Sequence, residues 1–190
     1  MNNFLIAIAS SGVAEDFEKH CVENNIKCIV THARGTAKPS IWSLFGLTDN
    51  KKVVFFIDSD VELNKIVNFA SQIDDKKIYM AQIGGKMSKE RLFVGIVNSG
   101  FSDEIMDLAR KLGATGGTIL DGRGTGKNAE FILGQEVDSS KEIVLIFCTE
   151  ELAKKLEDEM NDFIEKNDHV SGICFTLNAK LFKQLNTDNN

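Results

Sequence analysis

The chain has 190 residues, and 22 Lys plus Arg against 28 Asp plus Glu give it a formal net charge of −6. With 43% hydrophobic residues, this composition is typical of a globular protein and excludes a largely disordered chain. The acidic balance argues against general nucleic-acid binding, which needs a basic surface. The longest apolar runs are about six residues, against the roughly 20 that cross a bilayer, and residues 1–3 begin no secretion signal. We therefore expect a cytoplasmic protein without membrane insertion.

The first half predicts a strand over residues 4–9, followed by a helix with Val13, Phe17 and Cys21 on its apolar face. Further strands are expected at residues 51–57 and 77–83. Between them, the capping-box pattern of residues 59–62 predicts a helix start. The polar stretch of residues 84–91 is expected to be a linker.

The second half predicts the same order of elements. An apolar strand over residues 92–97 precedes a helix that begins with Ser102 as its cap and ends at Gly113. Residues 118–120 and 142–148 predict two more strands. Thr149 then caps a second helix, and a final strand is expected over residues 172–177.

The chain also contains an internal repeat with an offset of 88 to 90 residues. An apolar strand followed by Ser-Gly occurs at Ser11-Gly12 and again at Ser99-Gly100. The sequence Arg-Gly-Thr-x-Lys follows in both halves, at residues 34–38 and 123–127. A Lys-initiated apolar strand then occurs at residues 51–57 and 141–147. Because three matches occur in the same order, we interpret the chain as a duplication.

Two units of strand-helix-strand-strand-helix-strand predict an α+β protein with two tandem ferredoxin-like domains and antiparallel sheets. The expected bounds are residues 1–85 and 91–180, with a polar tail at 181–190. In such a domain both helices cover one face of the sheet and leave the other bare. The strands are apolar at nearly every position, so this second face must also be buried. Either the two sheets pack on each other within one chain, or several chains close a ring.

A glycine-rich stretch at residues 116–127 is the strongest candidate for a ligand site. Glycine amides without obstructing side chains can hold an anion, and nearby Arg and Lys side chains can neutralise it. The stretch matches neither a P-loop nor a G-x-G-x-x-G motif. A tight turn without a ligand is the structural alternative. The candidate binding residues are Ser99, Gly100, Gly122, Arg123, Gly124, Thr125, Gly126 and Lys127, with Arg34, Gly35, Thr36 and Lys38 in the first half.

No other constellation suggests catalysis or metal binding. The three histidines have neither triad nor metal spacing, and no paired carboxylates are distinct from the acidic background. The four cysteines contain no C-x-x-C pair, so free thiols in a reducing cytoplasm are expected. They are Cys21, Cys28, Cys148 and Cys174.

The second half resembles the PII-like signalling proteins, and the first half resembles a diverged copy of the same domain. The resemblance rests on residues 94–106, 113–120, 122–126, 141–146 and 172–177. It implies a trimeric ring of domains that binds an adenine nucleotide (AMP, ADP or ATP) between domains and regulates a partner protein, as in nitrogen metabolism. The family's glycine-lysine phosphate loop has no counterpart at residues 167–172, and its R-T-G-E element is missing, so AMP, ADP, another anion or no ligand are open alternatives to ATP. It also implies that Gly122–Lys127 begins a partner-binding loop. The only tyrosine, Tyr79, is on a predicted strand, so modification of a loop tyrosine is not expected.

Three functions follow as hypotheses. The first is a regulator, not an enzyme, that senses an anionic effector and forms homo-oligomers. The second is a protein similar to the trimeric CutA metal-tolerance proteins, without nucleotide binding. The third is an enzyme that uses the glycine loop. A thermal-shift screen with nucleotides and metals distinguishes them.

Overall fold

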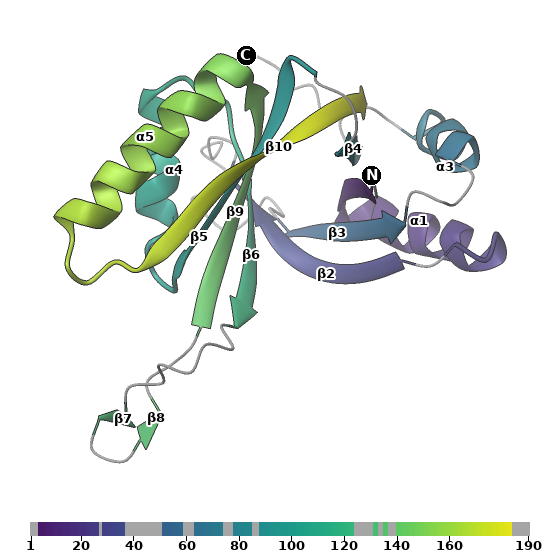
Figure 1. Ribbon diagram of the computed structural model, residues 1–190. Helices are drawn as coiled ribbons and strands as arrows, with labels where there is room; N and C mark the ends of the chain where they lie inside the picture. Colours follow the sequence, from purple (N-terminus) through teal and green to yellow (C-terminus); the bar gives the residue numbers. More distant parts are fainter. Residues whose placement is uncertain are drawn as a thin grey trace, which may run out of the picture.

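The computed structural model describes residues 4–26, 28–36, 51–58, 63–73, 78–84, 88–123, 131–132, 135–136 and 140–183. Figure 1 shows the arrangement of its elements. The first half comprises β1 (Phe4–Ser10), α1 (Ser11–Glu23), β2 (Cys28–Gly35), β3 (Lys51–Asp58), α3 (Leu63–Ala70) and β4 (Ile78–Ile83). The second half comprises β5 (Glu90–Asn98), α4 (Ser102–Lys111), β6 (Thr118–Arg123), β7 (Phe131–Ile132), β8 (Gln135–Glu136), β9 (Ser140–Thr149), α5 (Glu150–Lys166) and β10 (Gly172–Lys183).

Eight of these strands form one closed barrel in the order β1-β3-β2-β6-β9-β5-β10-β4, and all of the pairings are antiparallel. The prediction of two tandem ferredoxin-like domains with separate sheets is therefore wrong. Strands from both halves pair edge to edge, β2 with β6 and β10 with β4, so neither half keeps a sheet of its own. β7 and β8 form a separate two-stranded sheet. The domain bounds expected from the sequence stay a prediction.

Each half contributes four neighbouring strands in the same relative order, β4-β1-β3-β2 and β10-β5-β9-β6. The strands matched by the sequence repeat occupy equivalent places, since β1 corresponds to β5 and β3 to β9. α4 and α5 lie on one side of the barrel, and α1 and α3 lie on the other (Figure 1).

Strands β1, β4 and β5 are apolar along most of their length because both of their faces are buried. Alternate residues of β1 point to opposite sides: Leu5, Ala7 and Ala9 join the core beneath α1 and α3, whereas Ile6 and Ile8 join a core inside the barrel. β5 behaves in the same way, with Phe93 beneath α4 and α5 and Leu92 inside the barrel. The face that the sequence left unpartnered is therefore the barrel interior. Most of it is buried within one chain, although Ile29 and Ile173 on this face are 71% and 59% exposed. The oligomeric state stays a prediction.

Local signals explain several element ends. Thr149 caps α5 as predicted, because its hydroxyl accepts a hydrogen bond from the amide of Leu152 at 3.4 Å. Gly113, just after α4, has a φ of 106°, which suits glycine at the end of a helix. Ser102 is the first residue of α4 rather than its cap, and Phe101 at the cap position makes no side-chain capping bond. The predicted capping box at residues 59–62 lies outside the described residues.

Candidate functional site

The candidate site lies where the two halves meet along β2 and β6, which we call the β2/β6 seam. The strands pair through only three registered positions, Ala33↔Leu120, Arg34↔Ile119 and Gly35↔Thr118. Thr36 extends the contact, because its amide donates to the carbonyl of Gly117 at 3.0 Å and its hydroxyl accepts from the Gly117 amide at 2.8 Å. The Arg110 guanidinium of α4 donates to the Thr36 carbonyl at 2.7 Å.

Arg34 reaches from β2 of the first half to the start of α4 in the second. Its guanidinium donates to Asp103 Oδ1 and to Ser102 Oγ, both at 2.9 Å. It also lies 3.9 Å from Glu142 Oε1 of β9. Arg34 thus contacts one hydroxyl and two carboxylates of the other half of the chain.

Glu142 is the centre of this cluster, and its side chain is only 12% exposed. Its Oε2 accepts hydrogen bonds from the amides of Gly100, at 3.0 Å, and of Ser102, at 3.1 Å. These amides belong to the turn before α4 and to its first residue, where unpaired N–H groups and the helix dipole favour an anion. The Glu142 carboxylate therefore takes the place of a capping side chain for α4.

The β2/β6 seam thus contains the parts of an anion-binding site: two converging amides, a hydroxyl and a guanidinium. In this structure the anion is the chain's own carboxylate. The sequence predicted that Ser99, Gly100 and Arg34 would bind an anion, but it did not identify Glu142. The signal that could have found it was a charged residue in an apolar strand. The matching residue of the first half, Lys52, is also charged.

The structure brings some of the predicted residues together and separates others. Arg34, Gly35, Thr36 and Gly100 lie at the β2/β6 seam, and the Ser99 amide donates to the carbonyl of Ser140 at 3.1 Å. Gly122 and Arg123 are the last residues of β6 and pair with Lys141 and Ser140, so they do not begin the loop as predicted. The repeated arginines are not neighbours, since Arg34 pairs with Ile119. The other candidates lie outside the described residues; they are Lys38, Gly124, Thr125, Gly126 and Lys127.

The cysteines are poor nucleophiles at neutral pH. None of the four forms a disulfide. Burial raises the pKa of the Cys21 thiol to about 12 and that of Cys148 to about 11. Within the described part of the chain, no three His, Cys, Asp or Glu residues are grouped so that they could hold a metal ion. No described helix is long and apolar enough to cross a membrane.

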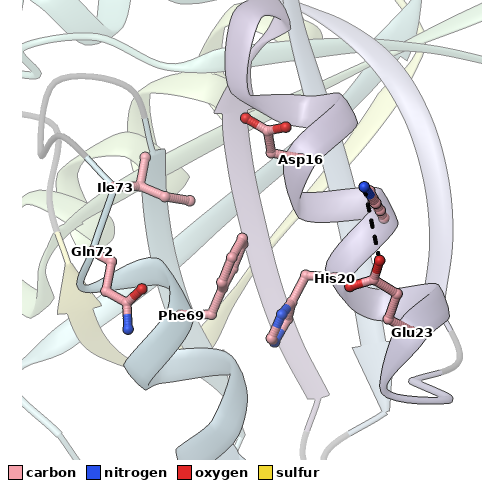
Figure 2. Close-up of a pocket in the computed structure, with 7 residues that line it drawn as sticks. Asp16, His20, Glu23, Phe69, Gln72 and Ile73 are labelled. Atoms are coloured by element: carbon pink, nitrogen blue, oxygen red, sulfur yellow. Dashed lines mark ion pairs between the residues drawn. The ribbon is translucent and has the colours of Figure 1, made fainter.

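Away from the β2/β6 seam, a hollow of about 390 Å³ lies between α1 and α3 (Figure 2). The His20 ring stacks flat on Phe69, with ring centroids 3.9 Å apart and planes 4° apart. On the same side of α1, Lys19 forms an ion pair with Glu23 at 3.9 Å. The lining holds the cation of Lys19 and the carboxylates of Asp16 and Glu23, so this hollow does not favour an anionic ligand.

Comparisons with known proteins give limited likenesses. No family model matches the chain, and no curated protein matches it. Among solved structures, a candidate PII-like signalling protein from Thermus thermophilus is 20% identical, with a TM-score of 0.37 over 48% of this chain and 88% of that chain. A protein of unknown function from Galdieria sulphuraria is 11% identical, with a TM-score of 0.35 over 92% of this chain and 98% of that one. Aspartate kinase from Synechocystis is 8% identical, with a TM-score of 0.34 over 91% of this chain and 43% of the kinase. TM-scores and identities this low establish no function.

Proposed function

We propose that the protein is a PII-like regulator, not an enzyme, that binds a small anionic effector at the β2/β6 seam. The effector we favour is an adenine nucleotide, whose phosphates would displace the Glu142 carboxylate from the amides of Gly100 and Ser102. The observation that supports this proposal is that these two amides already hold a carboxylate in the structure.

The position of Glu142 suggests how binding is communicated. Glu142 is two residues beyond Ser140, where β9 begins after the segment of residues 124–139. When Glu142 leaves the amides, the first residues of β9 lose one of their contacts with α4. We propose that this change alters how residues 124–139 are presented to a partner protein, as a population shift between two states.

Charge sets the condition for binding. With Glu142 in place, the cluster holds the Arg34 cation and the carboxylates of Glu142 and Asp103, which leaves no net attraction for another anion. When Glu142 leaves, Arg34 and the two amides are offered to the effector. The effector must therefore compete with an internal carboxylate, and we expect affinity to increase when that carboxylate is neutralised.

Calorimetric titration of the chain with ATP, ADP, AMP and inorganic phosphate tests the proposal. We expect one nucleotide to bind per chain. Arg34→Ala should weaken nucleotide binding by about 1.5–3 kcal/mol, the range for a hydrogen bond to a charged group. Glu142→Gln should strengthen binding. The control is Lys155→Ala, which removes a cation that is paired with Glu151 at 2.7 Å on α5, away from the β2/β6 seam.

Equal nucleotide affinity in the wild type and in Arg34→Ala would contradict the assignment of the site. Arg123→Ala tests the position proposed from the sequence alone, at the end of β6. If this variant loses affinity and Arg34→Ala does not, the effector binds at the end of the barrel instead. A mass measurement in solution, with and without nucleotide, tests the proposal that the chain forms homo-oligomers.

A further inference from the structure

Two cysteine side chains of the first half are in contact and take no part in the proposed function. Cys21 lies in the last turn of α1, and Cys28 is the first residue of β2 (Figure 1). The two thiols form a side-chain hydrogen bond with each other. Cys21 is a buried member of the core beneath α1 and α3, and Cys28 packs against the same core. The folded chain therefore holds two free thiols side by side.

The turn after α1 fixes the position of this pair. Asn25 has a φ of 55°, and its amide donates to the carbonyl of Val22 at 3.1 Å. The amide of Ile26 donates to the carbonyl of Cys21 at 2.8 Å. These two hydrogen bonds are those of a Schellman motif, which ends a helix and turns the chain. Cys28 follows two residues later and is held in the sheet by its pairing with β3, so backbone hydrogen bonds fix the chain on both sides of the thiol contact.

The two thiols differ in exposure and in acidity. Cys21 is 1% exposed, whereas Cys28 is half-buried. Burial raises the pKa of the Cys21 thiol to about 12, and the contact with Cys28 and the carboxylate of Glu18 add to this increase. Burial also raises the pKa of the Cys28 thiol, but the hydrogen bond that Cys21 donates lowers it in part, because this bond stabilises the thiolate; Glu18 again raises it. Cys28 is therefore the thiol that an external reagent reaches and that ionises first.

We propose that Cys21 and Cys28 are a modification site, which a low-molecular-weight disulfide oxidises to an intrachain disulfide. The Cys28 thiolate attacks one sulfur of the oxidant R–S–S–R, so that a Cys28–S–S–R bond forms and one R–S⁻ leaves. The Cys21 thiolate then attacks the Cys28 sulfur, which forms the bond between the two cysteines and releases the second R–S⁻. The two protein thiols lose two electrons and two protons, and the oxidant takes up both as two molecules of R–SH.

The disulfide would join the end of α1 to the start of β2. Because it closes a loop in the unfolded chain, the oxidised protein should melt at a higher temperature, by about 5–10 °C for a loop of this length in a chain of this size. The reaction should be slow at neutral pH and should accelerate about tenfold for each unit from about pH 7 to 9, because the pKa of the Cys28 thiol is raised above 9.0.

Oxidation of the full chain with 2-hydroxyethyl disulfide at about pH 9 tests the proposal, which does not depend on the regulatory function proposed above. After the remaining thiols are blocked with iodoacetamide, the chain is digested with trypsin without reduction. Trypsin cleaves after Lys27, so Cys21 and Cys28 are on different peptides that only a disulfide can join. We expect peptides 20–27 and 28–34 to appear in the mass spectrum as one linked product, which dithiothreitol separates.

Variants at each cysteine separate the two steps of the reaction. Cys21→Ala should stop at the mixed disulfide on Cys28, because no second thiol is in contact with it. Cys28→Ala should leave Cys21 unmodified, because the Cys21 thiol is buried. The matched control carries Cys148→Ala and Cys174→Ala together, and it should form the linked product as fast as the wild type. Circular dichroism verifies that each variant is folded.

Several results would overturn the proposal. They are the absence of the linked product at excess oxidant, a disulfide that joins either cysteine to Cys148 or Cys174, and a disulfide between two chains. A Cys28→Ala chain that takes up the reagent on Cys21 as fast as the wild type forms the linked product would also overturn it. So would an oxidised chain that melts at no higher temperature than the reduced one, because the bond would then strain the fold rather than fit it.

Discussion

The two seams that close the barrel use different interactions. At the β2/β6 seam, three registered pairs are supported by the Arg34, Glu142 and Arg110 side chains, which hold backbone and carboxylate groups of the other half or of the neighbouring helix. At the β4/β10 seam, the backbone ladder runs from Ile83↔Ala179 to Met80↔Lys183, and the Gly84 amide donates to the carbonyl of Asn178 at 2.8 Å. The side chain of Tyr79 is buried in the barrel interior beneath it.

This difference predicts which seam can respond to ions. Charged groups at the β2/β6 seam interact with dissolved anions and are screened by salt. The contacts described above for the β4/β10 seam are backbone hydrogen bonds and apolar burial, which salt and nucleotides change little. If the protein is a regulator, we expect it to respond at the β2/β6 seam while the β4/β10 seam stays unchanged.

The largest effect is expected from Glu142→Ala. This change removes the acceptor of the Gly100 and Ser102 amides and should lower the free energy of unfolding by about 2–4 kcal/mol. Urea denaturation measures it. Glu104→Ala, which removes an exposed carboxylate from the first turn of the same helix, is the control and should cost much less. Equal losses in the two variants would contradict the claim that the hydrogen bonds of Glu142 stabilise the β2/β6 seam.

Gly117→Ala should damage the same seam by overpacking. A Cβ at this position would lie 2.9 Å from Met106 Sδ and 3.0 Å from the carbonyl oxygen of Leu145. We expect a loss of about 1–3 kcal/mol, measured by thermal or urea unfolding. Gly12→Ala is the matched control, because a Cβ there meets nothing within 4 Å. A Gly117→Ala protein as stable as this control would show that the close approach at the seam is not required.

Arg34→Ala should have a smaller effect on stability, about 0.5–1 kcal/mol, because the Arg34 side chain is 44% exposed and that of Asp103 is 73% exposed. The loss should shrink as salt is raised, since the ion pair is screened. Urea denaturation at low and high salt measures this dependence. A salt-independent loss would indicate that Arg34 contributes by packing rather than by charge.

Tyr79→Phe should have the smallest effect at neutral pH, within about 1 kcal/mol, because the Tyr79 hydroxyl has no hydrogen-bond partner among the described residues. Burial raises the pKa of Tyr79 above its ordinary value of 10.0. Above pH 10 the unfolded chain loses a proton that the folded chain keeps, so stability falls as pH rises. Tyr79→Phe should remove this part of the alkaline loss. Unfolding curves from about pH 8 to 11 test it, and equal slopes for the two proteins would contradict it.

Local patterns in the sequence predict most of the elements but not their assembly. Each of these local signals consists of residues that are close together in the sequence; examples are the apolar runs of β1, β5 and β9 and the cap at Thr149. Closure of the barrel depends on β2 pairing with β6 across 85 residues, as Arg34↔Ile119 shows. Nothing in either strand's own sequence specifies that partner. The uninterrupted apolar pattern correctly required both faces to be buried, but it is compatible with a barrel as well as with a ring of sheets.

The candidate site shows the same limit. The turn at Gly100 and the shared spacing of the repeat around Arg34 indicated an anion-binding arrangement. Glu142 was not connected with this turn, because it is 40 residues beyond Ser102 and the sequence alone does not show that the two lie together. A charged side chain at a position that faces the helices is the feature that would have identified it.

The most direct test of effector binding at the β2/β6 seam follows the backbone amides of Gly100 and Ser102 by NMR while ATP is added. Displacement of Glu142 predicts that these two amide signals shift in a saturable way, together with the side-chain carboxyl carbon of Glu142, while amides along the β4/β10 seam stay unchanged. Amides of Gly100 and Ser102 that do not move at saturating ATP would contradict the claim that an effector replaces the internal carboxylate.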